Sequence, residues 1–181
     1  LQSGSSAVLK RMRRTYDRGR YMERVALIRE HVPDCAITTD VIVGFPGETE
    51  ADFEETLEVA EEVGYLGAFT LIFSPRRETE AATMEGQLPH PVKVERLERL
   101  VEVVQRRAGE RAQRFVGRTM EVLVEGTSRT DETKLRGRTR HGKAVNFDGI
   151  AAAGEMVQVE IEAATSQTLT GVLARSLTPL L

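Results

Sequence analysis

The spacing of apolar residues changes once along this chain, near residue 116, and this change limits the fold to two dissimilar parts. Residues 5–115 alternate between segments with helical spacing and short apolar runs. From Gly117 onward, apolar residues recur at every second position, as in Met120, Val122 and Val124, which is typical of strands with one buried face. We therefore predict an α/β domain over residues 1–116 and a small all-β antiparallel barrel of about five strands over residues 117–181.

The first part has the order helix, strand, helix, strand that is typical of parallel pairing beneath a layer of helices. Thr49 and Asp52 have the spacing of a capping box and mark the start of one helix. The polar segment 74–91 is long for a connection, and such loops are often functional. Helices are predicted over 5–14, 19–32, 50–63 and 92–115, and apolar strands over 35–43 and 68–73.

Composition excludes several classes of protein. Hydrophobic residues make up 40% and charged residues 29% of the 181 residues, as in ordinary folded domains. No apolar run approaches the roughly 18 residues of a membrane span, and no signal peptide is recognisable. Cys35 is the single cysteine, so this chain alone can form neither an internal disulfide nor a multi-cysteine zinc or iron–sulfur site. These features favour the reducing cytoplasm. Because the first residue is Leu1 rather than Met, we expect a piece of a longer protein.

A row of cations in the second part is the candidate nucleic-acid contact. The formal net charge is −3, so binding to RNA would need a local patch. Alternate side chains on a strand lie roughly 6.5–7 Å apart on one face, close to the spacing of successive phosphates, and no acidic residue falls between positions 134 and 143. The alternative is that these cations protect an exposed edge strand. The predicted RNA-binding residues are Lys134, Arg136, Arg138, Arg140 and Lys143.

A second basic run occupies the first two predicted helices, at Lys10, Arg11, Arg13, Arg14, Arg18 and Arg20. A solvated helix face explains such a run, and a second phosphate contact is the alternative.

Polar residues also gather where the predicted parallel strands end. Asp40 interrupts an apolar run, and a carboxylate on a buried strand needs a partner. That partner is either a structural arginine or a polar group of a ligand at the carboxyl edge of the sheet. The loop from Gly44 to Thr49 can bring its backbone close to a ligand, but it lacks the patterns that bind nucleotide phosphates. The three histidines lack metal-ligand spacing, so no metal site is predicted.

Three stretches resemble the radical-SAM methylthiotransferases, and the tRNA-modifying branch most. They are LQSGS through VLKRMRR at residues 1–14, TDVIVGFPGET at 39–49 and FSPR at 73–76. The terminal barrel is similar to a TRAM domain, an RNA-binding module. The resemblance implies the last part of a TIM-like radical-SAM barrel. It also implies a cytoplasmic enzyme that uses S-adenosylmethionine and two [4Fe-4S] clusters to add a methylthio group to the 2-carbon of N6-isopentenyladenosine beside the tRNA anticodon.

Carried over position by position, the resemblance implies a wall of the S-adenosylmethionine site and no catalytic acid, base or cluster ligand. The family binds its clusters through cysteines upstream of the QSGS segment, which this chain does not contain. We therefore expect the fragment to be inactive alone and limited to binding the tRNA anticodon stem-loop. A free-standing RNA-binding module, or the sister enzyme that modifies ribosomal protein S12, are the alternatives. The implied wall residues are Gln2, Ser3, Asp40, Ile42, Gly44, Phe73 and Ser74.

The loop after the second strand and the edge of the sheet carry two further expectations. Where the family usually has Pro-Gly-Thr-Pro, this chain has Arg77-Glu78-Thr79-Glu80, so the loop should differ in geometry. Two or three strands of a barrel leave an open edge and an uncovered apolar face, so we expect an oligomer or an exchange of elements.

Overall fold

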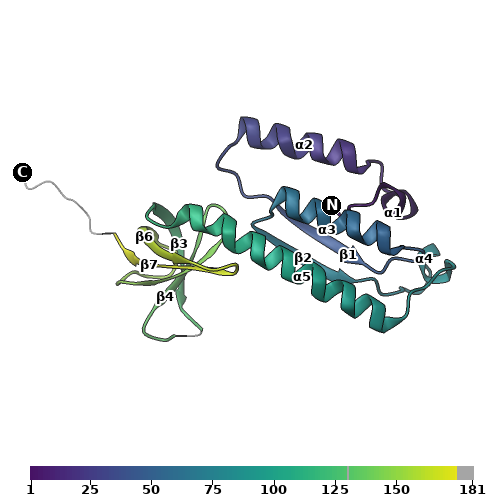
Figure 1. The fold of residues 1–181 in the computed structure, drawn as a ribbon. Coiled ribbons are helices and arrows are strands. Elements are labelled where there is room, and N and C mark those ends of the chain that lie inside the picture. Colours follow the sequence, from purple (N-terminus) through teal and green to yellow (C-terminus); the bar gives the residue numbers. More distant parts are fainter. Residues whose placement is uncertain (130, 175–181) are drawn as a thin grey trace, which may run out of the picture. The chain divides into compact units, whose positions relative to one another are not determined.

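The computed structural model describes residues 1–129 and 131–174 (Figure 1). They form two compact units, which divide between Arg107 and Ala108. The first unit ends inside the helix α5 (His90–Ala112), earlier than the change of apolar spacing near residue 116.

The first unit contains a two-stranded parallel sheet with helices on one face (Figure 1). Strand β1 (Thr38–Val43) pairs with β2 (Gly67–Ile72), and Asp40 lies opposite Phe69. This confirms the predicted parallel pairing. The remaining elements of this unit are α1 (Ser6–Arg11), α2 (Arg18–His31), α3 (Glu50–Val63), α4 (Glu80–Thr83) and the greater part of α5. The short α4 lies in the segment predicted as an irregular loop.

The core of this unit lies between the sheet and α2, α3 and α5. Val41 and Val43 of β1 pack with Phe53 and Val63 of α3 and with Leu100 of α5, all at most 1% exposed. The opposite face of the sheet is different: Phe69 is 74% exposed and Leu71 is 50% exposed. The predicted uncovered apolar face is therefore present.

Asp40 lies on this open face and is exposed. The expectation that its carboxylate is buried is wrong. Thr39, Val41 and Val43 point toward the helices, and the alternate residues of β1 point away from them. Because helices cover only one face of the sheet, the carboxylate needs no buried partner.

The second unit contains a closed five-stranded barrel with the order β3-β4-β5-β7-β6. Alternate residues of β3 fill its core, since Met120, Val122 and Val124 are at most 5% exposed. This confirms the small all-β barrel. Its elements are η1 (Gln113–Phe115), β3 (Thr119–Thr127), β4 (Leu135–Thr139), β5 (Ala144–Asp148), β6 (Met156–Ala164) and β7 (Thr168–Leu173).

One pairing departs from the predicted antiparallel barrel, because β5 and β7 run parallel. The reason is strand order. β6 pairs antiparallel with β3, and β7 turns back antiparallel to β6. β7 therefore has the direction of β3, and so does β5, which follows β4 in a meander. Among the described helices, none has the length and apolarity needed to cross a membrane.

Candidate functional site

A hollow of about 230 Å³ lies at the carboxyl end of the two-stranded sheet. Its apolar side includes Ile42 of β1 and Phe45 and Phe73, which follow β1 and β2. The Phe45 and Phe73 rings meet edge to face, with centroids 5.1 Å apart. The hollow is also lined by Arg11, Met12, Arg13, Arg14, Glu80, Ala81 and Met84.

Arginines from the end of α1 give the hollow a cationic rim. The Arg11 guanidinium donates a 2.9 Å hydrogen bond to the Gly47 carbonyl and lies 3.5 Å from the Asp52 carboxylate. Arg13 forms an ion pair with Glu80 of α4. Apolar and aromatic walls beside guanidinium groups suit a ligand that combines a flat apolar part with an anionic group.

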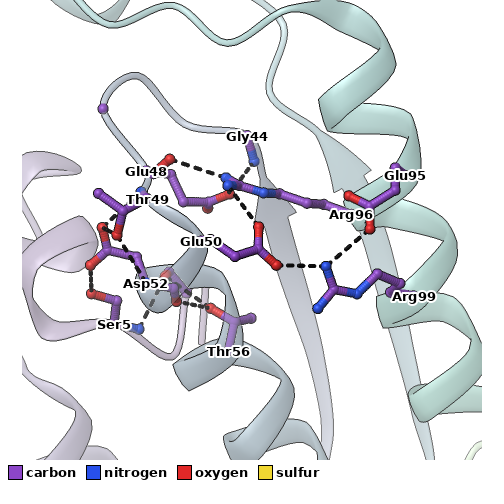
Figure 2. Close-up of polar contacts among 12 residues, drawn as sticks. Ser5, Gly44, Glu48, Thr49, Glu50, Asp52, Thr56, Glu95, Arg96 and Arg99 are labelled. Atoms are coloured by element: carbon purple, nitrogen blue, oxygen red, sulfur yellow. Dashed lines mark hydrogen bonds and ion pairs between the residues drawn. The ribbon is translucent and has the colours of Figure 1, made fainter.

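The loop that carries Phe45 is fixed by a buried ion pair (Figure 2). Gly44 has φ +73°, and its N–H donates a 2.9 Å hydrogen bond to Oε1 of Glu48. The same oxygen accepts a 2.7 Å hydrogen bond from Arg96 of α5. The Glu48 side chain is 1% exposed and that of Arg96 is 5% exposed. Burial raises the pKa of Glu48, although the Gly44 N–H and Arg96 oppose the change.

The end of this loop is the predicted capping box. Thr49 accepts a hydrogen bond from the Asp52 N–H, and the Asp52 carboxylate accepts one from the Thr49 N–H (Figure 2). Both bonds satisfy N–H groups that a helix start leaves unpaired. The capping box therefore fixes where α3 begins and where the loop from Gly44 ends.

The QSGS segment packs along α3 rather than into the hollow. A Cβ on Gly4 would lie 2.4 Å from the Glu55 carbonyl oxygen, so only glycine permits this approach. Ser3 is fully buried, and its hydroxyl is 3.3 Å from that of Thr56. Ser3 thus joins the segment to α3, because its side chain points toward that helix.

The structure brings only two of the seven implied wall residues, Ile42 and Phe73, into the lining of the hollow. Gln2 lies beside β1, where its carbonyl accepts a 2.9 Å hydrogen bond from the Ile42 N–H. Gly44 packs behind the lining, against Lys93. Ser74 and Asp40 are exposed and are not lining residues.

Sequence reasoning missed the arginine rim and Phe45. The signal was present in the basic run of residues 10–20, which a solvated helix face explained equally well. Arg11, Arg13 and Arg14 acquire their position because α1 ends beside the loops that follow β1 and β2.

In the second unit, Arg136 and Arg138 share the outward face of β4, as predicted. Both are ion-paired with Glu125 of β3: Nε of Arg138 lies 2.9 Å and Nε of Arg136 lies 3.6 Å from its carboxylate. These arginines lower the pKa of Glu125, chiefly through the hydrogen bond from Arg138. Sequence spacing did not reveal this acid, because it comes from the adjacent strand.

The other predicted RNA-binding residues fall outside β4. Lys134 precedes the strand and lies 3.1 Å from the Asp148 carboxylate. Arg140 is exposed in the turn that follows.

Lys143 does not join the exposed cations. It is 6% exposed, and its ammonium donates a hydrogen bond to the Ser166 carbonyl. Burial lowers the pKa of Lys143. The predicted alternation stops at Thr139, because the chain turns before β5 begins at Ala144. As placed, Lys143 ties the β4–β5 turn to the β6–β7 turn.

Comparison with known proteins assigns both units. Residues 1–60 match the Radical SAM superfamily, and residues 113–174 match the TRAM domain. Over 172 residues the chain is 52% identical to a tRNA-2-methylthio-N(6)-dimethylallyladenosine synthase of Clostridium botulinum (strain Langeland). It is 49% identical to the synthase of the same name from Clostridium perfringens (strain SM101). Each alignment covers 94% of this chain and 38% of the relative, so the chain spans about two fifths of the length of these relatives. The chain therefore combines a Radical SAM segment with a TRAM domain, and 94% of its length is similar to these synthases.

Proposed function

We propose that this chain contributes one wall of the S-adenosylmethionine site and the RNA-binding module of a tRNA methylthiotransferase. The observation that carries the proposal is the hollow at the carboxyl end of β1 and β2, which lies in the unit that matches the Radical SAM superfamily. Parallel α/β folds place their ligands at this edge of the sheet.

The residues of the hollow fit part of S-adenosylmethionine. Ile42, Phe45 and Phe73 offer apolar contacts to a flat adenine ring. Arg11 and Arg14 offer guanidinium groups to a carboxylate. When bound, S-adenosylmethionine supplies the radical chemistry and the methyl group of this family. The lining residues bind and orient this ligand, and the apolar wall excludes water.

The residues do not fit an iron–sulfur cluster. Cys35 is the single cysteine of the sequence, and the described residues contain no group of three His, Cys, Asp or Glu side chains that could hold a metal. The two [4Fe-4S] clusters that the resemblance implies would need ligands from outside this chain. We therefore propose that the chain alone does not catalyse methylthiolation.

The TRAM unit supplies the RNA contact, through Arg136, Arg138 and Arg140. The first two share one face of β4, and the third is exposed in the next turn. A face of this kind suits phosphates rather than bases. The proposed partner is the anticodon stem-loop of a tRNA in the cytoplasm, where the adenosine beside the anticodon receives the methylthio group.

Two binding measurements test the proposal. Fluorescence anisotropy with a labelled anticodon stem-loop should show saturable binding that weakens as salt is added, whereas ribosomal protein S12 should not compete. Titration calorimetry with S-adenosylhomocysteine, a stable analogue, should show binding to the first unit that Phe73→Ala weakens. Failure to bind RNA would overturn the assignment of the TRAM unit. Failure to bind the analogue would overturn the assignment of the hollow.

A further inference from the structure

Helix α5 places two cations in the interior beside the hollow. Lys93 is 7% exposed and Arg96 is 4% exposed, and they are three residues apart on one face of the helix. Lysine and arginine are seldom buried unless paired. If these two positions served only packing, apolar residues would be sufficient. The contacts of these two side chains therefore indicate what they do.

Arg96 holds the loop that follows β1 (Figure 2). Its Nη1 donates to the Glu48 carbonyl at 3.1 Å and to the Glu48 carboxylate at 2.7 Å. Its Nη2 donates to Glu50 at 3.1 Å. Since Oε1 of Glu48 also accepts from the Gly44 N–H, Arg96 fixes the backbone immediately before Phe45, a lining residue.

Lys93 holds the loop that follows β2. Its Nζ donates to the Phe73 carbonyl at 3.2 Å and lies 5.1 Å from the centroid of the Phe73 ring. Its aliphatic chain lies against Gly44, because a Cβ built on Gly44 would lie 2.5 Å from Cγ of Lys93. A single side chain thus contacts both loops that carry the aromatic lining.

We propose that Lys93 and Arg96 are positioning residues, which hold the Phe45 and Phe73 rings in the edge-to-face arrangement that an adenine-containing ligand would contact. The inference rests on the proposed function of the hollow. Neither cation lines the hollow, so both act through the backbone at Gly44 and Phe73. Sites held by locked supporting side chains lose affinity when that support is removed.

The test is calorimetric titration of S-adenosylhomocysteine into the full chain and into Lys93→Met and Arg96→Met. Each variant should weaken binding by about tenfold or more. Arg99→Met is the matched control. Arg99 lies on the same helix and shares Glu50 as a partner (Figure 2), yet its ion pairs are with Glu50, Glu54 and Glu95 rather than with Glu48. The Arg99 variant should bind as the parent does.

A spectroscopic measurement separates positioning from general stability. In amide ¹H–¹⁵N spectra, Arg96→Met should shift the Gly44 resonance and Lys93→Met should shift that of Phe73, while the barrel resonances stay in place. Arg96→Lys should restore part of the affinity. If a methionine variant does not fold, Glu48→Gln replaces it as the test. This change removes the charge that pairs with Arg96 and alters the side-chain shape little. The Gly44 resonance should again shift, and the affinity should again fall.

The outcomes distinguish this inference from the proposed function. Variants that bind the analogue as tightly as the parent would overturn the positioning role. If the parent does not bind, the assignment of the hollow fails, and the amide spectra decide the positioning role alone. Unmoved Gly44 and Phe73 resonances would then overturn it, and displaced ones would support it.

Discussion

The Ser5 hydroxyl donates a 2.5 Å hydrogen bond to Oδ1 of Asp52, and both residues are buried. This contact joins the QSGS segment to the first turn of α3. Burial raises the pKa of Asp52, but hydrogen bonds from Ser5 and Thr49 and the nearby Arg11 guanidinium outweigh it, so the pKa of Asp52 lies below its ordinary value. The ionised carboxylate therefore stabilises the fold.

We expect Ser5→Ala to destabilise the first unit by roughly 1–2 kcal/mol at pH 7. Because the folded state lowers the pKa of Asp52, the stabilisation is present above its ordinary pKa of about 4 and disappears as pH falls through the folded value. The cost of the substitution should therefore shrink at pH 3. This loss of unfolding free energy is measured by urea unfolding, monitored through tyrosine fluorescence. The signal reports on the first unit, because Tyr16, Tyr21 and Tyr65 all lie in it. An equal cost at both pH values would contradict this account.

Gly4→Ala should destabilise the first unit by more than about 2 kcal/mol. The added Cβ would meet backbone atoms of α3, at 2.4 Å from the Glu55 carbonyl oxygen and 2.5 Å from Cα of Thr56, and backbone in a helix cannot move aside cheaply. Gly19→Ala is the control, because Gly19 is exposed on α2 with its nearest atom 3.5 Å away. That change should stabilise by about 0.5–1 kcal/mol. Similar effects of the two substitutions in urea unfolding would refute the close-approach argument.

Glu78→Gly should stabilise the loop that follows β2. Glu78 has φ +66°, a left-handed conformation that costs a residue with a Cβ roughly 1 kcal/mol relative to glycine. The resemblance to the methylthiotransferases also implies glycine at this place. Limited proteolysis should show slower cleavage between residues 74 and 89 in the variant. Arg77→Gly, at the neighbouring exposed position, should accelerate cleavage instead. Faster cleavage of both variants would show that backbone strain at Glu78 does not control how readily the loop is cleaved.

The open face of the sheet should drive self-association. Phe69 and Leu71 expose large apolar side chains next to each other along β2, and such patches tend to be covered by a partner. We expect sedimentation velocity to show a concentration-dependent dimer for the parent chain and a monomer for Phe69→Ser/Leu71→Ser. A monomeric parent at high concentration would contradict the expectation.

The elements that local spacing specifies could be predicted from the sequence. The capping box at Thr49 and the apolar stripe of Phe53, Ala60 and Val63 predict α3 with the bounds that the structure has. The period-two spacing of β3 likewise predicts which of its residues are buried. Both predictions work because each element packs one face against a core, and residue spacing shows which face that is.

Side chains whose surroundings come from distant segments could not be predicted. Lys93 and Arg96 of α5 are buried, whereas Val94 between them is partly exposed. The reason is that the partners of the two cations lie on the loops after β1 and β2. The spacing of β4 likewise gave no sign that Glu125 lies beside its arginines, or that Lys143 would turn inward. Asp40 is exposed, contrary to the prediction, because helices cover only one face of its sheet.

The salt dependence of RNA binding shows whether the TRAM unit neutralises phosphates. The affinity for an anticodon stem-loop should fall linearly on a logarithmic salt scale. Arg136→Gln/Arg138→Gln should weaken binding and reduce the slope by about one for each phosphate that the variant no longer neutralises. Glu125→Gln should strengthen binding, because it removes the carboxylate that pairs with both arginines. The control is Arg99→Gln/Arg106→Gln, which removes the same number of paired charges from α5 in the first unit. Its slope should match that of the parent. An unchanged slope in the Arg136/Arg138 variant would contradict phosphate binding by the TRAM unit.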